Sequence, residues 1–377
     1  MKKNNILHII IGLGKGGAEK TLYQSIIKTK NCFNHKVISL TDSGYYRNLL
    51  IDNSVEVYCC NFKKKSLNVL PFIRILYLLL LNRKYTFQTW MHHSNFLGGI
   101  IGKLFFVKKI YWNIRGEGIS DKHSKILTKF IFKMNAKLSY FIPNKIITCS
   151  KSAINNYVNN GYKNNFLLIH NGCDTNIYKS NINIRKIYRK KLNLDDNIFV
   201  IGMAARFSRQ KNHLLLLETL KSLNDKNIPF VCLLAGSQMN KMNKKLKNYI
   251  DELNLKNQVI LLDQIDNIND FMNAIDIHVL TSSYGEGFPN VIIESMACET
   301  ISISSDVGDS SIILNNNKFV FEKDNKQDFL KKLLYLYNIY VNDINTWKNI
   351  SFKNHKIVKD FYSIEKMIND YKMIWTK

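Results

Sequence analysis

Short apolar runs recur along the chain and are separated by polar segments. The runs at 6–11, 110–114 and 199–204 are almost free of charged side chains. A strand buried on both faces of a parallel sheet gives such a continuous run, whereas a half-exposed strand alternates. Segments with helical spacing, such as 18–27 and 214–223, follow these runs. The alternation of strands and helices predicts an α/β protein whose parallel sheets are covered by helices on both faces.

This pattern occurs twice, so two doubly wound domains are expected. A polar stretch at 171–197 separates the two occurrences, and we place the domain boundary at its start. A length of 377 residues is sufficient for two domains. The expected strands are 6–11, 36–40, 55–60, 85–90, 110–114 and 145–149, then 199–204, 230–235, 259–262, 277–280 and 301–304. The expected helices are 18–27, 67–81 and one from Ser152, then 214–223, 268–274 and 291–297. The tail is expected to alternate helical segments, the last of them at 364–375.

The chain is strongly basic, and its charge is uneven. Lys and Arg total 54 against 29 Asp and Glu, a formal net charge of +25. Residues 1–176 carry 26 basic and 7 acidic side chains, a net charge of +19, and the remainder carries +6. Such a surface favours an anionic partner: a nucleic acid, a membrane surface or a phosphorylated substrate. The sequence contains no recognised nucleic-acid module, so we expect no nucleic-acid partner.

The cysteines and the apolar segments indicate the compartment. Seven cysteines, with no CxxC pair and no zinc spacing, predict a reduced, cytoplasmic location and no metal site. The N-terminal apolar run is short and ends in glycines, which is typical of a first strand rather than a signal peptide. No stretch has the roughly 18 apolar residues that span a bilayer. The most apolar segment, 69–81, contains Arg74 and is expected to be a buried or interfacial helix.

A glycine-rich loop follows the first expected strand. Gly12, Gly14 and Gly17 match the pattern G-x-G-x-x-G between a strand and a helix, and Asp42 follows the second strand. In dinucleotide-binding domains such a loop approaches a pyrophosphate and such an acid binds a ribose. An NAD(P)-dependent oxidoreductase is therefore an alternative function. No hydride-transfer residues are evident, and the loop alone indicates only that backbone N–H groups can approach a phosphate or a sugar.

The second domain carries a denser set of charged residues. Glu286 lies in a Gly-flanked loop after a strand, and Glu294 lies about one turn into the next helix, so both carboxylates can face the carboxyl edge of the sheet. Arg206 and Lys211 follow another strand and can neutralise a diphosphate leaving group. The N–H groups at 288–290, where the helix starts, suit an anion. This set fits a ligand with hydroxyls and a diphosphate, such as a sugar nucleotide.

Four segments resemble motifs of one family, in the same order and at the same spacing. They are GGAE at 16–19, HNGCD at 170–174, GMAARFSRQK at 202–211 and EGFPNVIIESMAC at 286–298. The chain resembles the retaining glycosyltransferases of family 4, the glycosyl transferases group 1, over nearly its whole length. The resemblance implies the GT-B fold, in which two Rossmann-like domains face an interdomain cleft. It assigns 1–170, with a C-terminal helix at about 361–377, to an acceptor-side domain, and 171–360 to a nucleotide-sugar-binding domain.

The resemblance also implies roles for the matched residues. Arg206 and Lys211 would hold the donor diphosphate and stabilise its departing charge. Glu286 would contact the donor sugar and the reacting face, and Glu294 would bind the ribose of the nucleotide. The other donor-binding residues that the resemblance implies are Gly16 and Gly17, which would let the first domain close over the donor, and Gly287, Phe288, Pro289 and Asn290, which would lie near sugar and phosphate.

One further site and four departures concern the same resemblance. His92 or His93 stands where the family often has an acceptor-side histidine, and the pair can equally be a capping or core feature. Glu299 and Asp263 stand where the family commonly has glycine, Ile301 where it has proline, and Ile312 where it often has an acid. These departures bear on the nucleotide base and on the identity of the sugar rather than on the phosphate site.

The resemblance implies a retaining, metal-independent hexosyltransferase. A nucleotide sugar, expected to be UDP-linked, would be its substrate, and no cofactor is expected. In agreement, the chain lacks Asp-x-Asp, the motif by which the other large glycosyltransferase fold holds a divalent ion. The basic first domain suits an anionic membrane surface. We therefore expect a peripheral protein on the inner face of the cytoplasmic membrane, with a polyprenyl-diphosphate-linked glycan acceptor in polysaccharide biosynthesis; a soluble acceptor is the alternative.

Overall fold

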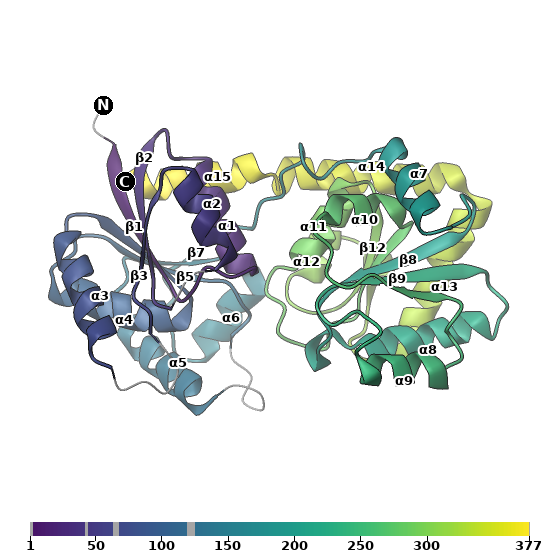
Figure 1. The fold of residues 1–377 in the computed structure, drawn as a ribbon, viewed down its shortest axis with the longest axis horizontal. Coiled ribbons are helices and arrows are strands. Elements are labelled where there is room, and N and C mark those ends of the chain that lie inside the picture. Colours follow the sequence, from purple (N-terminus) through teal and green to yellow (C-terminus); the bar gives the residue numbers. More distant parts are fainter. Residues whose placement is uncertain (1–2, 42–43, 63–67, 119–124, 377) are drawn as a thin grey trace. The chain divides into compact units, whose positions relative to one another are not determined.

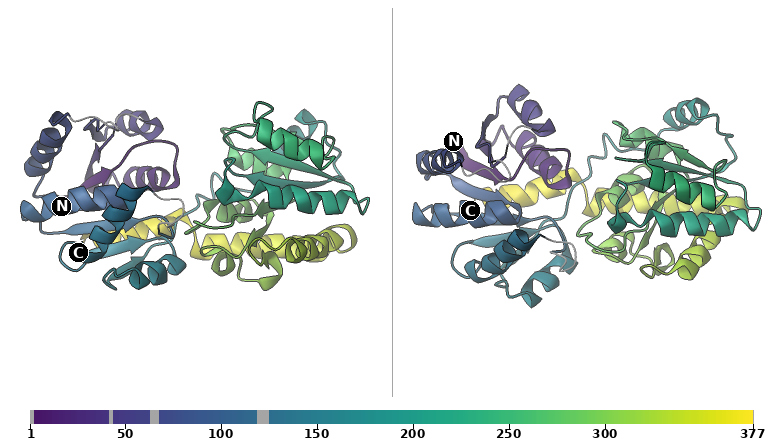
Figure 2. Two further views of the ribbon diagram at one scale, coloured as in Figure 1. Left: turned by 90° about the horizontal axis from the view of Figure 1, so that it is seen from below. Right: turned by 60° about the horizontal axis from the view of Figure 1, so that its bottom comes forward.

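The chain folds into two compact units. The structure, a computed structural model, describes residues 3–41, 44–62, 68–118 and 125–376. Unit 1 comprises Met1–Gly172 together with Glu365–Lys377, and unit 2 comprises Cys173–Ile364. Each unit contains one parallel sheet with helices on both faces (Figure 1 and Figure 2). The predicted α/β fold class is thus confirmed.

Unit 1 is built on a seven-stranded sheet in the order β3-β2-β1-β4-β5-β6-β7. The chain order reverses between β1 and β4, which makes this pair the topological switch point, where such sheets bind ligands beyond their carboxyl ends. The strands are β1 (Asn4–Ile10), β2 (Phe33–Ser39), β3 (Glu56–Cys59), β4 (Thr86–Trp90), β5 (Ile110–Ile114), β6 (Lys145–Thr148) and β7 (Phe166–Leu168). The helices are α1 (Gly17–Ile27), α2 (Tyr45–Asp52), α3 (Leu70–Leu81), α4 (Met91–Leu104), α5 (Ile126–Leu138), α6 (Lys151–Asn159) and α15 (Ile364–Thr376).

Helices α3, α4 and α5 cover the side of this sheet that carries apolar side chains (Figure 1). Alternate residues of the central strands point toward them and form one hydrophobic cluster with them. Glycines allow α4 to lie directly on the sheet, because a β-carbon on Gly99 would come within 2.8 Å of Trp112 Nε1. The cluster includes Leu7, Ile9, Ile75, Phe87, Ile101, Trp112 and Phe132.

The opposite face of the same strands is polar, and α15 forms hydrogen bonds with it. Trp375 Nε1 donates to Gln88 Oε1 at 2.6 Å. Asn113 Nδ2 donates to Tyr371 Oη at 2.9 Å. Since buried polar groups are costly without hydrogen-bond partners, the sheet of unit 1 depends on this last helix of the chain.

Unit 2 repeats the topology with six strands in the order β10-β9-β8-β11-β12-β13, and its switch point lies between β8 and β11. The strands are β8 (Phe199–Ala204), β9 (Phe230–Ala235), β10 (Val259–Leu261), β11 (Ile277–Leu280), β12 (Ile301–Ser305) and β13 (Val320–Phe321). The helices are α7 (Ile182–Lys191), α8 (His213–Asn224), α9 (Lys244–Glu252), α10 (Ile268–Ala274), α11 (Asn290–Ala297), α12 (Ser310–Leu314), α13 (Lys326–Asn342) and α14 (Ile344–Phe361), with 3₁₀ turns at Arg209–Lys211 and Asn317–Phe319.

Several elements escaped the sequence prediction, and α7 shows why. This helix lies within the polar stretch 171–197. Its buried side chain is Arg189, which is 1% exposed and forms an ion pair with Asp276 at 2.7 Å. An arginine on the inner face leaves no apolar stripe for a pattern to detect. The other elements that the prediction missed are α2, α4, α5, α9, α12, β7 and β13.

Candidate functional site

The charged residues predicted in the second domain gather at the switch point of unit 2. Arg206 and Lys211 follow β8, and Glu286 follows β11. The two strands are parallel neighbours, so both loops leave the same edge of the sheet. Ligands of doubly wound sheets bind in the crevice at this edge.

Lys211 and Glu286 form an ion pair across this point. Lys211 Nζ donates to Glu286 Oε1 at 2.5 Å, and both side chains are largely buried. Ser282 Oγ donates to the same carboxylate oxygen at 2.7 Å. The carboxylate is therefore held by a cation and a hydroxyl, which fixes its direction before any ligand arrives.

Arg206 lies on the exposed side of the same loop. Its Nη2 donates to Gln210 Oε1 at 3.0 Å, and Gln210 Nε2 donates to the Gly285 carbonyl at 3.1 Å. The backbone of Gln210 also accepts a hydrogen bond from the Ser283 N–H at 2.8 Å. These bonds tie the loop that carries the two cations to the loop that carries Glu286.

The amino end of α11 completes this group in unit 2. Pro289 is the N-cap, Asn290 is the first helical residue, and the first turn contains no acidic side chain. Gly287 and Phe288 lead into the helix, and the Phe288 ring lies 5.4 Å from that of Tyr362. A helix amino end carries partial positive charge and unsatisfied N–H groups, which favours an anion. Further along the helix, Glu294 is 7% exposed.

Gly308 holds the Glu286 loop, and the sequence analysis assigned it no role. It has a φ of +56°, and a β-carbon there would lie 2.1 Å from the Glu286 carbonyl oxygen. The next residue, Asp309, donates its N–H to the Gly287 carbonyl at 2.9 Å. Only glycine fits such a position. Its place in the loop after the predicted strand 301–304 was the available signal.

In unit 1, Gly16 and Gly17 lie at the amino end of α1, beyond β1. Gly16 is the N-cap, and a β-carbon on it would meet a carboxylate oxygen of Glu19 at 2.3 Å. Burial raises the pKa of Glu19. A carboxyl group thus already occupies the first turn of α1, which disfavours the pyrophosphate of a dinucleotide there. Asp42, the proposed ribose ligand of the oxidoreductase alternative, lies outside the described residues.

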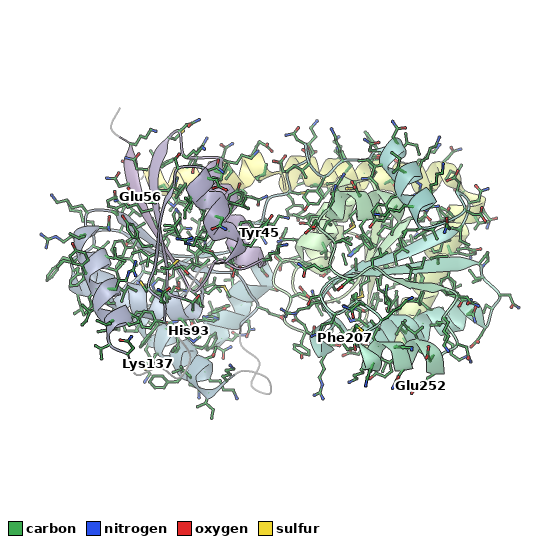
Figure 3. The ribbon with its side chains drawn as sticks, viewed as in Figure 1. Tyr45, Glu56, His93, Lys137, Phe207 and Glu252 are labelled. Atoms are coloured by element: carbon green, nitrogen blue, oxygen red, sulfur yellow. The ribbon has the colours of Figure 1, made fainter. Side chains whose placement is uncertain are left out.

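His92 and His93 lie in the first turn of α4, after β4, and they differ in environment. His92 Nε2 is 3.2 Å from Tyr157 Oη, and its ring lies 5.4 Å from that of Phe132. Burial and the neighbouring His93 lower the pKa of His92 to about 4, so it is a neutral side chain within an aromatic cluster. His93 (Figure 3) is half-buried, and it is the member of the pair that is more open to a ligand.

Arg115, directly after β5, is a cation at the same sheet edge that the sequence analysis missed. Its Nη1 donates to Asn171 Oδ1 at 2.5 Å, and its Nη2 donates to Tyr371 Oη. The guanidinium lies 5.3 Å from the Trp90 ring centroid. Its buried Nε has no hydrogen-bond partner among the described residues. The signal was its position, one residue beyond a predicted strand.

Comparison with known proteins identifies the family. Residues 184–351 match the sequence profile of the Glycosyl transferases group 1 family. The chain is 26% identical over 334 residues to the UDP-Gal:alpha-D-GlcNAc-diphosphoundecaprenol alpha-1,3-galactosyltransferase of Escherichia coli, covering 84% of this chain and 83% of that protein. It is 24% identical to the capsular polysaccharide biosynthesis glycosyltransferase CapM of Staphylococcus aureus, with 62% of each chain covered.

Solved structures with the same fold extend over the whole chain. The Anabaena protein HepE in complex with UDP superposes with a TM-score of 0.84 at 18% identity, covering 99% of both chains. The lipopolysaccharide outer core galactosyltransferase WaaB superposes with a TM-score of 0.71 at 15% identity and the same coverage. The two units therefore have the architecture of GT-B glycosyltransferases. Residues 184–351 thus match the glycosyl transferases group 1 family, and the chain is a glycosyltransferase rather than an oxidoreductase.

Proposed function

We propose that this glycosyltransferase moves a hexosyl group from a UDP-sugar to a lipid-linked glycan, with retention of configuration and without a metal ion. The observation that carries the proposal is the charged group at the switch point of unit 2. There Arg206 and Lys211 stand opposite Glu286, beside the amino end of α11. The two cations and the amino end of the helix can bind the negatively charged diphosphate, and the carboxylate can accept hydrogen bonds from the sugar hydroxyls.

In the proposed reaction, the bond between the sugar C1 and the donor diphosphate breaks as the acceptor hydroxyl bonds to C1 on the same face. The hydroxyl proton passes to the departing phosphate oxygen. Arg206, Lys211 and the N–H groups of α11 stabilise the charge that develops on UDP. Glu286, already oriented by Ser282 and Lys211, contacts the sugar, and Glu294 binds the ribose.

The relatives support the donor and the acceptor class. The name of the E. coli relative specifies UDP-Gal and a diphosphoundecaprenol-linked acceptor. The CapM relative is named for capsular polysaccharide biosynthesis, and HepE was crystallised with UDP. We propose by analogy that this chain acts in cell-surface polysaccharide synthesis, at the inner face of the cytoplasmic membrane. No described helix meets the length and hydropathy needed to cross a bilayer.

Thermal unfolding with and without nucleotides tests the proposed site. Saturating UDP is expected to raise Tm by on the order of 5 °C, in the presence of EDTA, because a ligand that binds only the folded state stabilises it. The Arg206→Ala and Glu294→Ala variants are expected to lose this shift. Lys244→Ala, which removes an exposed cation from α9, is the matched control and should keep it.

The proposal fails if UDP leaves Tm unchanged while NAD or NADP raises it. It also fails if the Arg206→Ala and Glu294→Ala variants respond to UDP as the unaltered protein does. A shift that EDTA abolishes would contradict the metal-independent mechanism.

A further inference from the structure

The outer side of α3 in unit 1 is apolar although it is exposed. Ile75, Leu78 and Leu79 on its inner side are buried in the core. A helix that is apolar all round is typically covered on every side. Among the described residues nothing covers the outer side, where large apolar side chains are 42% to 67% exposed. These side chains are Leu70, Phe72, Ile73, Tyr77, Leu80 and Leu81.

The apolar surface continues along the same helical layer. Helix α4 packs against both α3 and α5, and all three cover one face of the sheet (Figure 1). Phe106, just after α4, is 88% exposed, and Ile126 at the start of α5 is 87% exposed. Leu127 and Phe130 on α5 are also exposed. We call this outer surface of α3, the end of α4, and α5 the apolar face.

The three helices that form the apolar face carry basic side chains and no acidic ones. Lys125, Lys129, Lys133 and Lys137 (Figure 3) recur at every fourth position along α5, so they share one side of this helix. The sequences of α3, α4 and α5 contain no Asp or Glu. Like charges four residues apart repel one another, and an external anion relieves this repulsion.

We propose that the apolar face docks on a bilayer containing anionic lipid. The apolar and aromatic side chains would enter the boundary between headgroups and acyl chains, and the lysines would reach lipid phosphates. Uniform positive charge mixed with apolar surface matches an anionic bilayer better than a protein surface, which carries both signs. The inference rests on the proposed function, since a lipid-linked acceptor brings the enzyme to a membrane.

Vesicle co-sedimentation of the full chain tests the proposal. The protein is expected to bind vesicles of phosphatidylcholine with 30 mol% phosphatidylglycerol, and to bind pure phosphatidylcholine much less. Removing three lysines should weaken binding to the anionic vesicles by about 100-fold at low salt, at roughly fivefold per lysine. The lysine variant combines Lys125→Gln, Lys133→Gln and Lys137→Gln, and all three side chains are exposed. The apolar variant, expected to lose binding to a similar degree, combines Ile73→Gln, Tyr77→Gln and Leu81→Gln.

Matched variants in unit 2 test whether vesicle binding depends on the apolar face itself or only on the overall charge and hydrophobicity of the chain. They remove the same number of exposed side chains of each kind and should bind anionic vesicles as the unaltered protein does. The lysine control combines Lys241→Gln, Lys244→Gln and Lys247→Gln. The apolar control combines Ile182→Gln, Ile187→Gln and Phe352→Gln.

The outcomes that overturn the proposal are distinct. They are no binding to anionic vesicles, equal loss in the unit 2 controls, and a dimer in gel filtration that the apolar variant converts to a monomer. UDP-induced stabilisation separates this inference from the proposed function. The two unit 1 variants should keep the UDP shift, whereas Arg206→Ala should lose it and still bind vesicles.

Discussion

At the scale of single residues, the ion pair between Lys211 and Glu286 is the central feature. The two residues are 75 positions apart, and each lies in the loop that follows a strand of the unit 2 switch point. Burying two charges is costly unless further hydrogen bonds support them, and Ser282 supplies one. The position of the Glu286 carboxylate is therefore set in advance, which is what stabilisation of a developing charge requires.

We predict that Glu286→Gln lowers the rate of UDP release from a UDP-sugar by about 10²–10³-fold, since the amide keeps the shape but loses the charge. The rate is measured with water as acceptor for UDP-galactose and UDP-glucose. Ser282→Ala, which removes one hydrogen bond to the same oxygen, should have a smaller effect. The variant should still give the circular dichroism spectrum of the folded protein; near-normal turnover would exclude Glu286 from the reaction.

A second residue-scale prediction concerns Glu299, which ends α11 with a φ of +61°. The N–H of Thr300 bonds to the Ser295 carbonyl and that of Glu299 to the Met296 carbonyl, the Schellman pattern in which glycine is preferred. Glu299→Gly should stabilise unit 2 by about 0.5 kcal/mol, because relief of the left-handed strain exceeds the added freedom of the unfolded chain. Urea unfolding measures the change.

Glu299→Ala is the control for that prediction. It removes the same charge and keeps the β-carbon, so it should give no stabilisation. Equal stabilisation by both variants would point to the charge as the cause. Asp263, the other residue at a position where the family has glycine, also has a positive φ, of 55°. The two departures at glycine positions of the family thus fall on backbone that favours glycine.

At the scale of elements, α15 covers the polar face of the unit 1 sheet. Trp375 is 2% exposed and lies edge-on to the rings of His8 and His35 at 5.7 and 5.3 Å. The two histidines are joined by a hydrogen bond of 3.0 Å between His8 Nε2 and His35 Nδ1. The helix thus covers polar groups that sit in the middle of the sheet.

Trp375→Ala is expected to destabilise unit 1 by about 3–5 kcal/mol, the cost typical of removing a buried tryptophan. The measurement is urea unfolding followed by circular dichroism. Met373→Ala on the same helix is the control, because Met373 is 58% exposed and its loss should cost less than about 0.5 kcal/mol. Similar losses in the two variants would contradict the docking role of Trp375.

Most strands could be predicted, and several helices could not. Apolar runs gave the bounds of β5, β8, β9 and β11 to the residue, because strands buried on both faces must be apolar almost throughout. Helix α4 was missed because its glycines, required for contact with the sheet, weaken the helical pattern. Helix α7 was missed because its inner side is held by an arginine.

At the scale of the whole molecule, neutral buried histidines occur in both units. Burial lowers the pKa of His35 to about 3. Burial together with the charge of Lys211 lowers the pKa of His278 to about 3 and that of His213 to about 4. Burial together with the neighbouring His93 lowers the pKa of His92 to about 4. An unfolded histidine has a pKa near 6.5. Below that pH the unfolded chain takes up protons that the folded chain does not, so the free energy of unfolding falls as pH falls.

We predict that the urea midpoint is lower at pH 5.5 than at pH 7.0, with each such histidine contributing about 1 kcal/mol. His213→Phe should reduce this pH dependence in unit 2. Neither ring nitrogen of His213 has a hydrogen-bond partner among the described residues, and the ring lies 5.5 Å from that of Phe207. The variant therefore removes a titrating group without breaking a hydrogen bond. A midpoint that is unchanged or higher at pH 5.5 would contradict the prediction.

The sequence alone determined the fold class and which charged residues belong to the candidate site. Apolar runs and loop motifs are local, so the chain carries them without folding. Tertiary structure decided what those residues contact. The pairing of Lys211 with Glu286, the different surroundings of His92 and His93, the place of Arg115 and the exposure of α3 depend on segments distant in sequence. Contacts of that kind arise only when strands align and bring their carboxyl ends to one edge.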